Sequence, residues 1–189
     1  MTKQAQFFQT ALELIHEKGF KAMTIRDLAK ALSCDPANIY NYVRSKADLL
    51  DQLLFEISAE FHRGIDEILQ SGLTPPQQIE ELIRQHVELS AQRPLQVGLL
   101  VNEWRNLKDS RLLEFVGERN AYEQKVQQIL RQGIRTKYFR DFDPELICFT
   151  VLGCLRWQHS YNLRSQIEHQ NPLRVREEIR RFVLPGLLI

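Results

Sequence analysis

Residues 24–46 of the chain read TIRDLAKALSCDPANIYNYVRSK, and this stretch predicts two short helices joined by a tight turn. Thr24 is typical of a helix N-cap, and Asp27 three residues later completes the pattern of a capping box. A second helix start follows at Asp35, because its carboxylate can cap free amides and Pro36 is tolerated at the first helical position. The stretch therefore predicts a helix, a break and a second helix.

The second of these helices, expected over residues 37–43, is poorly suited to burial. Its large aliphatic side chains are Ile39 and Val43, and most of the others are amides and phenols. Asparagine can pair bidentately with adenine, and tyrosine hydroxyls suit phosphate oxygens. This composition indicates the recognition helix of a helix-turn-helix motif. An ordinary corner between two helices, with a polar exposed face, is the alternative.

The candidate DNA contacts are amides, hydroxyls and cations in and around these two helices. Asn38 and Asn41 are expected to read base edges, whereas the hydroxyl and ammonium groups are expected to hold phosphates. The candidate DNA-binding residues are Thr24, Arg26, Asn38, Tyr40, Asn41, Tyr42 and Lys46.

Residues 8–54 resemble the N-terminal DNA-binding domain of the tetracycline-repressor (TetR) family of bacterial transcription regulators. The matching segments read ALELIHEKGF, MTIRDLAKAL and NIYNYVRSKADLL. The chain departs from the family at the turn, where Ser33-Cys34-Asp35 replaces the usual glycine-valine-serine, and Val43 replaces a usual aromatic residue. The resemblance covers about a quarter of the chain and implies a helix-turn-helix regulator that binds DNA.

Length and charge narrow the classes of function that the chain can have. At 189 residues and 43% hydrophobic composition, the chain can bury a core of one or two domains. Its net charge of +1 excludes a uniformly basic nucleic-acid coat, so DNA affinity must come from placed cations such as Arg26, Arg44 and Lys46. The three cysteines fit reduced thiols. Without a recognisable signal peptide or membrane-spanning stretch, a cytoplasmic protein is expected.

The rest of the chain also reads as helices, and about nine are expected in an all-α fold. A first helix is expected from about Lys3 to Lys18, and a longer one from Lys46 to about Gln70. Later helix starts are indicated at Thr74-Pro75-Pro76, Leu95, Asp109-Ser110, Asp143-Pro144 and Pro172. We expect residues 1–46 to form the helix-turn-helix domain and residues 47–189 to form a ligand-binding and dimerisation domain.

The helix that begins at Pro144 is apolar nearly all round until Arg156, so it must be covered on all sides. Gly153 is small enough to allow a second helix to approach closely. We expect the last two helices to pair with those of a second subunit in a four-helix interface, as the resemblance implies; packing within one subunit is the alternative. The candidate interface residues are Leu152, Gly153, Trp157, Tyr161, Ile179, Phe182 and Val183. A homodimer could read a palindromic operator with two recognition helices.

The middle of the chain suggests a ligand chamber, because aromatic residues are interspersed there with a few polar side chains. The candidate ligand-binding residues are Phe61, His62, His86, Leu99, Glu103, Trp104 and Tyr122. The segments EWRNLKD and ILRQGIRTKYFRDFDPELICFTVLGCLRW resemble, more faintly, TetR regulators that answer acyl-CoA thioesters. This second resemblance implies an acyl-CoA or fatty-acid effector, with Arg105, Arg119 and Arg156 as partners for phosphates.

Enzymatic motifs are missing from the sequence. It contains no glycine-rich phosphate loop, nucleophile elbow or HExxH pair, and its five histidines are scattered. We therefore expect no catalytic site, no cofactor and no metal. The expected function is a transcriptional repressor that binds operator DNA as a homodimer and is released by a small, largely apolar effector. A DNA-binding protein without an effector, or an all-helical enzyme, are the alternatives.

Overall fold

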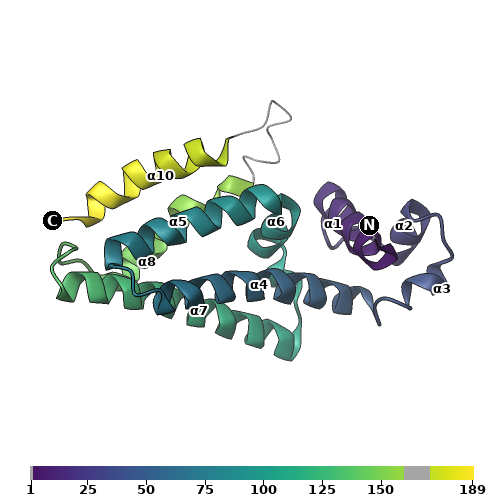
Figure 1. The fold of residues 1–189 in the computed structure, drawn as a ribbon. Helices are drawn as coiled ribbons and strands as arrows, with labels where there is room; N and C mark the ends of the chain where they lie inside the picture. The colour runs from purple at the N-terminus through teal and green to yellow at the C-terminus, as the bar shows by residue number, and fades with distance from the viewer. Residues whose placement is uncertain (1, 160–170) are drawn as a thin grey trace. The chain divides into compact units, whose positions relative to one another are not determined.

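The computed structural model describes residues 2–159 and 171–189, and it confirms the expected all-α fold (Figure 1). The helices are α1 (Lys3–Lys18), α2 (Ile25–Ala31), α3 (Pro36–Ile39), α4 (Lys46–Gln70), α5 (Pro75–Gln92), α6 (Pro94–Asn102), the 3-10 helix η1 (Trp104–Asn106), α7 (Asp109–Arg135), α8 (Pro144–Arg156) and α10 (Pro172–Leu187). The extended structure within the described residues is one isolated bridge between Phe139 and Leu188. Tyr161, a predicted interface residue, lies outside the described residues.

The helix starts follow the capping residues of the sequence. Thr24 Oγ1 accepts a hydrogen bond from the Asp27 amide at 3.1 Å, and Asp27 Oδ2 accepts one from the Thr24 amide at 2.9 Å. Asp35 Oδ1 accepts from the Ala37 amide at 2.7 Å, and Asp143 caps α8 in the same way. Each cap satisfies amides that have no partner inside the helix. The predicted starts of α2, α3 and α8 are therefore confirmed.

The recognition helix is shorter than predicted. Regular α-helix stops at Ile39, and the amides of Tyr40, Asn41 and Tyr42 bond to carbonyls three residues back. Bonds of this spacing belong to tighter 3-10 turns, which are common where a helix ends. The prediction of α-helix over residues 37–43 is thus wrong in its second half, although the chain keeps turning in the same sense there.

Contacts divide the chain into two compact units, which we call the N-terminal unit and the bundle unit. The N-terminal unit comprises the residues up to Ser58 together with Leu95–Val116. Its core is built from α1, α2, α3, the first half of α4, α6 and the start of α7. Buried members from these elements include Phe7, Leu28, Ile39, Leu49, Leu99 and Phe115. The segment around α6 therefore completes the core beneath the helix-turn-helix.

The bundle unit comprises Ala59–Pro94 and Gly117–Ile189. Its core takes residues from α4, α5, α7, α8 and α10, among them Ile65, Ile83, Val126, Leu152 and Val183. Helices α5, α8 and α10 pack against one another within it. None of the described helices is long and apolar enough to cross a membrane.

These units do not coincide with the division predicted at residue 46. Residues 95–116 pack with the N-terminal unit, and both α4 and α7 continue from one unit into the other. Residue 46 marks the end of the helix-turn-helix, so the functional division there stays a prediction. The packing unit that supports the helix-turn-helix is larger than the motif itself.

Candidate functional site

The recognition segment exposes polar side chains because its two aliphatic residues face the core. Ile39 and Val43 are buried, whereas Asn38, Tyr40 and Asn41 are exposed. Thr24 and Arg26, at the start of α2, are exposed as well. Five of the seven predicted DNA contacts therefore lie on the surface of the N-terminal unit and could reach base edges or phosphates.

The other two predicted DNA contacts are held by neighbours within the protein. Tyr42 is half-buried, and its ring stacks on Phe7 with the centroids 4.6 Å apart. Lys46 Nζ donates to the Lys21 carbonyl at 3.0 Å and lies 4.5 Å from the centroid of the Phe20 ring. Partial burial lowers the pKa of Lys46, and the charge of Glu103 opposes that shift. Both residues support the helix-turn-helix, and their phosphate contacts stay predictions.

Three predicted ligand residues lie in the N-terminal unit. Leu99 is buried in its core, and the Trp104 ring stacks on Phe115 with centroids 6.3 Å apart. Glu103 Oε1 accepts a hydrogen bond from the Phe20 amide at 3.4 Å. These residues hold the segment around α6 to the core of the N-terminal unit, and their ligand contacts stay predictions.

The remaining four predicted ligand residues come together in the bundle unit. His86 Nε2 lies 2.8 Å from the Tyr122 hydroxyl, so the two side chains share a hydrogen bond. The Phe61 ring lies 4.8 Å from the His86 ring and 6.2 Å from the Tyr122 ring, and the His62 ring lies 5.6 Å from Tyr122 (centroid distances). Residues from α4, α5 and α7 thus form one aromatic cluster, and their contact with a ligand stays a prediction.

The His86–Tyr122 pair is uncharged near neutral pH. Burial lowers the pKa of His86 to about 3, and the nearby charge of Arg156 acts in the same direction. Burial likewise raises the pKa of the Tyr122 hydroxyl well above its usual range. A neutral imidazole and a neutral phenol can each donate or accept hydrogen bonds, so the pair supplies polarity without charge.

His62 carries a small polar network that the sequence did not indicate. Its Nε2 lies 3.1 Å from the Glu118 carbonyl and its Nδ1 lies 3.4 Å from Lys125 Nζ. These contacts fit a ring that donates from Nε2 and accepts at Nδ1. Lys125 also pairs with Asp66 at 2.6 Å. The i to i+4 spacing of His62 and Asp66 was the available clue, but their shared partner lies on another helix.

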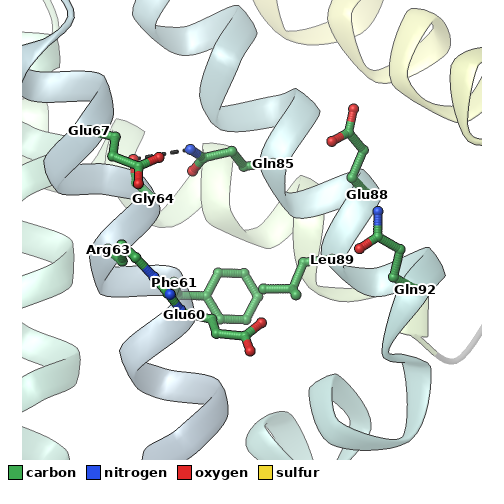
Figure 2. Close-up of a pocket in the computed structure, with 9 residues that line it drawn as sticks. All are labelled: Glu60, Phe61, Arg63, Gly64, Glu67, Gln85, Glu88, Leu89 and Gln92. Atoms are coloured by element: carbon green, nitrogen blue, oxygen red, sulfur yellow. Dashed lines mark hydrogen bonds between the residues drawn. The ribbon is translucent and has the colours of Figure 1, made fainter.

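An open groove of about 210 Å³ runs between α4 and α5 in the bundle unit (Figure 2). We call it the α4–α5 groove, and its lining residues are Glu60, Phe61, Arg63, Gly64, Glu67, Gln85, Glu88, Leu89 and Gln92. Figure 2 shows Phe61 and Leu89 pointing toward each other from opposite helices. Gln85 Nε2 donates to the Gly64 carbonyl at 3.1 Å. Phe61 therefore belongs both to this groove and to the aromatic cluster.

The predicted dimer residues separate into two groups. Leu152, Ile179 and Val183 are buried in the core of the bundle unit, and their place in a dimer interface stays a prediction. In contrast, Gly153 and Trp157 are exposed on α8, and Phe182 on α10 is 76% exposed. Sequence reasoning missed other exposed apolar residues, namely Leu146 and Phe149 on α8, Pro185 on α10 and Ile189 just beyond α10. Their spacing opposite the buried stripe was the available signal.

The three arginines expected to bind phosphates are divided between the two units. Arg105 lies over the Trp104 ring in the N-terminal unit, 4.4 Å from its centroid. Arg156 lies in the bundle unit and pairs with Glu123 at 3.4 Å. Arg119 lies on α7 in the same unit. Of the three, Arg156 is near enough to affect His86 electrostatically.

Comparisons with known proteins agree with this arrangement. Residues 7–53 match the bacterial regulatory proteins of the tetR family, and residues 72–160 match the tetracyclin repressor-like C-terminal domain. The HTH-type transcriptional repressor KstR2 of Mycolicibacterium smegmatis is 25% identical over 148 residues, which cover 77% of this chain and 72% of that protein.

Solved structures show the same fold. The ketosteroid transcriptional regulator KstR2 of Mycobacterium tuberculosis superposes with a TM-score of 0.92 at 20% identity, covering 100% of this chain and 96% of that one. AibR in complex with isovaleryl coenzyme A and operator DNA gives 0.84 at 16% identity, covering 97% and 99%. Together with the exposed helix-turn-helix surface, these matches establish that the chain belongs to the TetR family of transcriptional regulators.

Proposed function

We propose that the protein represses transcription by binding a palindromic operator as a homodimer, and that a small, largely apolar effector releases it. The observation that carries this proposal is the recognition segment, where buried Ile39 and Val43 leave Asn38, Tyr40 and Asn41 exposed. A recognition element of this length contacts few base pairs, so a selective site needs two of them about one DNA turn apart. Such a regulator acts in the cytoplasm.

The exposed apolar residues of α8 and α10 support the homodimer. Large apolar side chains that remain exposed on neighbouring helices mark a surface for association. Phe182 and Ile189 are each 76% exposed, and Leu146 is 63% exposed. The proposed interface is therefore the outward face of α8 and α10, with Gly153 allowing close approach of a partner helix. Leu152, Ile179 and Val183 support this face from beneath.

The aromatic cluster of the bundle unit supports the effector. Ligand sites are usually apolar with a few placed polar groups, and the cluster combines Phe61 with the neutral His86–Tyr122 pair. The proposed ligand contacts are thus Phe61, His62, His86 and Tyr122. An acyl-CoA is the first effector class to test, because AibR was solved with isovaleryl coenzyme A.

The DNA half of the proposal is tested on an operator selected from random duplexes. Asn41→Ala should lose preference at one position per half-site, at a cost of about 1–3 kcal/mol for the favoured base. Arg44→Ala, which removes an exposed cation from the same surface, should weaken all sequences alike and reduce the salt dependence of binding. Equal losses on selected and random DNA in both variants would refute the assignment of Asn41 to base reading.

The effector half is tested by titrating isovaleryl-CoA, octanoyl-CoA and free coenzyme A into the complex of protein and labelled operator. At least one ester should lower operator affinity tenfold, while free coenzyme A should not. A tenfold effect requires the ester to favour the released form by only about 1.4 kcal/mol. If no ester changes operator affinity, the acyl-CoA effector is refuted. The remaining hypothesis is then a protein that binds DNA without an acyl-CoA effector.

A further inference from the structure

Phe61 belongs both to the lining of the α4–α5 groove and to the aromatic cluster that contains the His86–Tyr122 pair. One side of it lines the groove, and its ring lies 4.8 Å from the His86 ring. In Figure 2 the ring occupies the middle of the groove, opposite Leu89.

The surroundings of Phe61 allow that ring to turn. Phe61 is half-buried, and a phenylalanine side chain has two rotatable bonds with a small set of rotamers. Gly64, one turn further along α4, has no side chain to block the groove. A Cβ at Gly64 would lie 2.4 Å from the Gln85 amide oxygen, so the amide occupies the space a larger residue would take. The groove wall is therefore built from a small residue, a flexible amide and a movable ring.

The pair behind Phe61 is suited to an uncharged oxygen. One hydrogen bond joins His86 Nε2 to Tyr122, which leaves the phenol oxygen with further hydrogen-bonding capacity. The buried core of this unit, against which Tyr122 packs, is largely aliphatic and includes Leu82, Val126 and Ile129. Arg156, whose charge acts on His86, and Lys125, which contacts His62, are already paired with Glu123 and Asp66. An ionised group would therefore lose its hydration there without gaining a free counter-ion, whereas a hydroxyl or carbonyl would gain a hydrogen bond.

We propose that Phe61 is a gate, and that the effector passes it from the α4–α5 groove to place an uncharged hydroxyl or carbonyl oxygen against Tyr122 and His86. The inference rests on the proposed effector response and assigns the chemical class that this site takes: an apolar molecule that carries a neutral hydroxyl or carbonyl oxygen. Any ionised part of the same molecule stays at the groove, where Arg63 and Glu67 are exposed.

The gate is tested first without any effector or DNA. Diethyl pyrocarbonate modifies neutral imidazole, so the rate of His86 modification, followed by mass spectrometry of peptides, measures access to the pair. Phe61→Ala should raise that rate at least tenfold relative to the exposed His16 of the same sample. Leu73→Ala, which shortens an exposed apolar side chain elsewhere in the unit, should leave it unchanged. If circular dichroism shows that the alanine variant is unfolded, Phe61→Leu replaces it in the labelling experiment. Equal His86 rates in the wild type and the folded gate variant would overturn the gate.

The ligand class is tested with three probes that share one chain: 1-octanol, octanoate and octylammonium, each titrated into the full-length protein at pH 7.5. The alcohol should bind at least tenfold more tightly than either ion. Tyr122→Phe should reduce that preference to less than threefold, whereas Tyr138→Phe, which removes a hydroxyl from an exposed ring, should preserve it. Binding of the ions as tight as that of the alcohol, or a preference that survives Tyr122→Phe, would overturn the inference.

These outcomes can be told apart from those of the operator experiments. If octanol binds through Tyr122 while no ester releases the operator, the ligand site stands and the acyl-CoA response fails. If an ester releases the operator while His86 labelling and the octyl series go against the gate, the regulator stands and its effector enters elsewhere.

Discussion

At the scale of single residues, the turn of the helix-turn-helix shows how the chain accommodates an unusual sequence. Ser33 has a φ of 52°, in the left-handed region, and follows the C-cap of α2. Its amide bonds to the Lys30 carbonyl, and the amide of Cys34 reaches back to Ala29 at 3.0 Å. This is the pattern of a Schellman motif, in which glycine is the favoured left-handed residue. Serine holds the same geometry at a steric cost.

That cost predicts a stabilising substitution. Ser33→Gly should raise the free energy of unfolding by about 0.5–1 kcal/mol, because relief of the left-handed strain exceeds the added freedom of the unfolded chain. Ser33→Ala is the matched control and should give no gain, since alanine keeps the Cβ that causes the strain. Urea unfolding followed by circular dichroism measures both. A glycine variant no more stable than the alanine variant would show that the serine is unstrained.

Individual roles near the turn illustrate what a sequence pattern can and cannot predict. The caps at Thr24 and Asp35 depend on residues two or three positions away, and both were predictable. The placement of Lys46 depends on Lys21 and Phe20, which lie in a different loop. No local sequence pattern predicts the contacts of Lys46 with Lys21 and Phe20. Lys46 is predicted to bind phosphate, and it also stabilises the start of α4.

At the scale of whole elements, α8 shows why helix bounds were easier to predict than helix faces. Asp143 and Pro144 determine where α8 starts, and that start is confirmed. The helix is apolar on both sides, so periodicity could not tell which side faces its own core. The structure places Leu152 inside and Gly153 outside. Leu152 and Gly153 are neighbours in the sequence and both are predicted interface residues, yet their positions face opposite sides of the helix.

The outward face of α8 and α10 predicts the effect of a new charge. Phe182→Glu should weaken the proposed homodimer by at least about a hundredfold, because burying one phenylalanine is worth about 1.5–3 kcal/mol and a twofold interface contains two copies. Gln128→Glu adds a carboxylate to an exposed position of α7 and should leave association unchanged. Analytical ultracentrifugation across nanomolar to micromolar concentrations measures both. A wild-type protein that stays monomeric at micromolar concentration would refute the interface itself.

At the scale of the whole molecule, the N-terminal unit contains more than the helix-turn-helix. Residues 95–116 contribute Leu99 and Phe115 to its core, although about fifty residues separate them from the motif along the chain. The sequence showed that these residues are apolar, but contact between distant segments leaves no mark on local periodicity. Leu99→Trp would therefore overfill the core beneath the recognition segment rather than a ligand chamber.

Four of the seven predicted ligand residues do meet, because α4, α5 and α7 each direct an aromatic residue or histidine into the bundle unit. The pattern that predicted them was a polar residue within an apolar helix face. The same pattern also selected Glu103 and Trp104, which serve the other unit. A polar residue within an apolar helix face therefore indicates a buried polar contact, but it does not indicate which unit contains that contact.

The buried His86 makes the stability of the folded molecule depend on pH. Its pKa is about 3 in the folded protein against an ordinary value of 6.5, because burial disfavours the charged ring. Below pH 6.5 the unfolded chain takes up a proton at this residue while the folded protein does not. The free energy of unfolding should therefore fall as the pH is lowered from 6.5 toward 3. By linkage, the loss at pH 5 is about 2 kcal/mol.

A variant that cannot titrate at this position isolates the effect from those of the other histidines. His86→Asn removes the ionisable ring and keeps a side chain able to bond to Tyr122. Urea unfolding at pH 7.5 and pH 5.0 should show the wild type losing about 2 kcal/mol more than the variant between the two conditions. His16→Asn, at an exposed histidine, is the control for an arbitrary histidine substitution and should lose as much stability as the wild type. If wild type and His86→Asn lose stability equally, His86 is not held neutral in the folded state, and its pairing with Tyr122 cannot exclude charged ligands in the way proposed here.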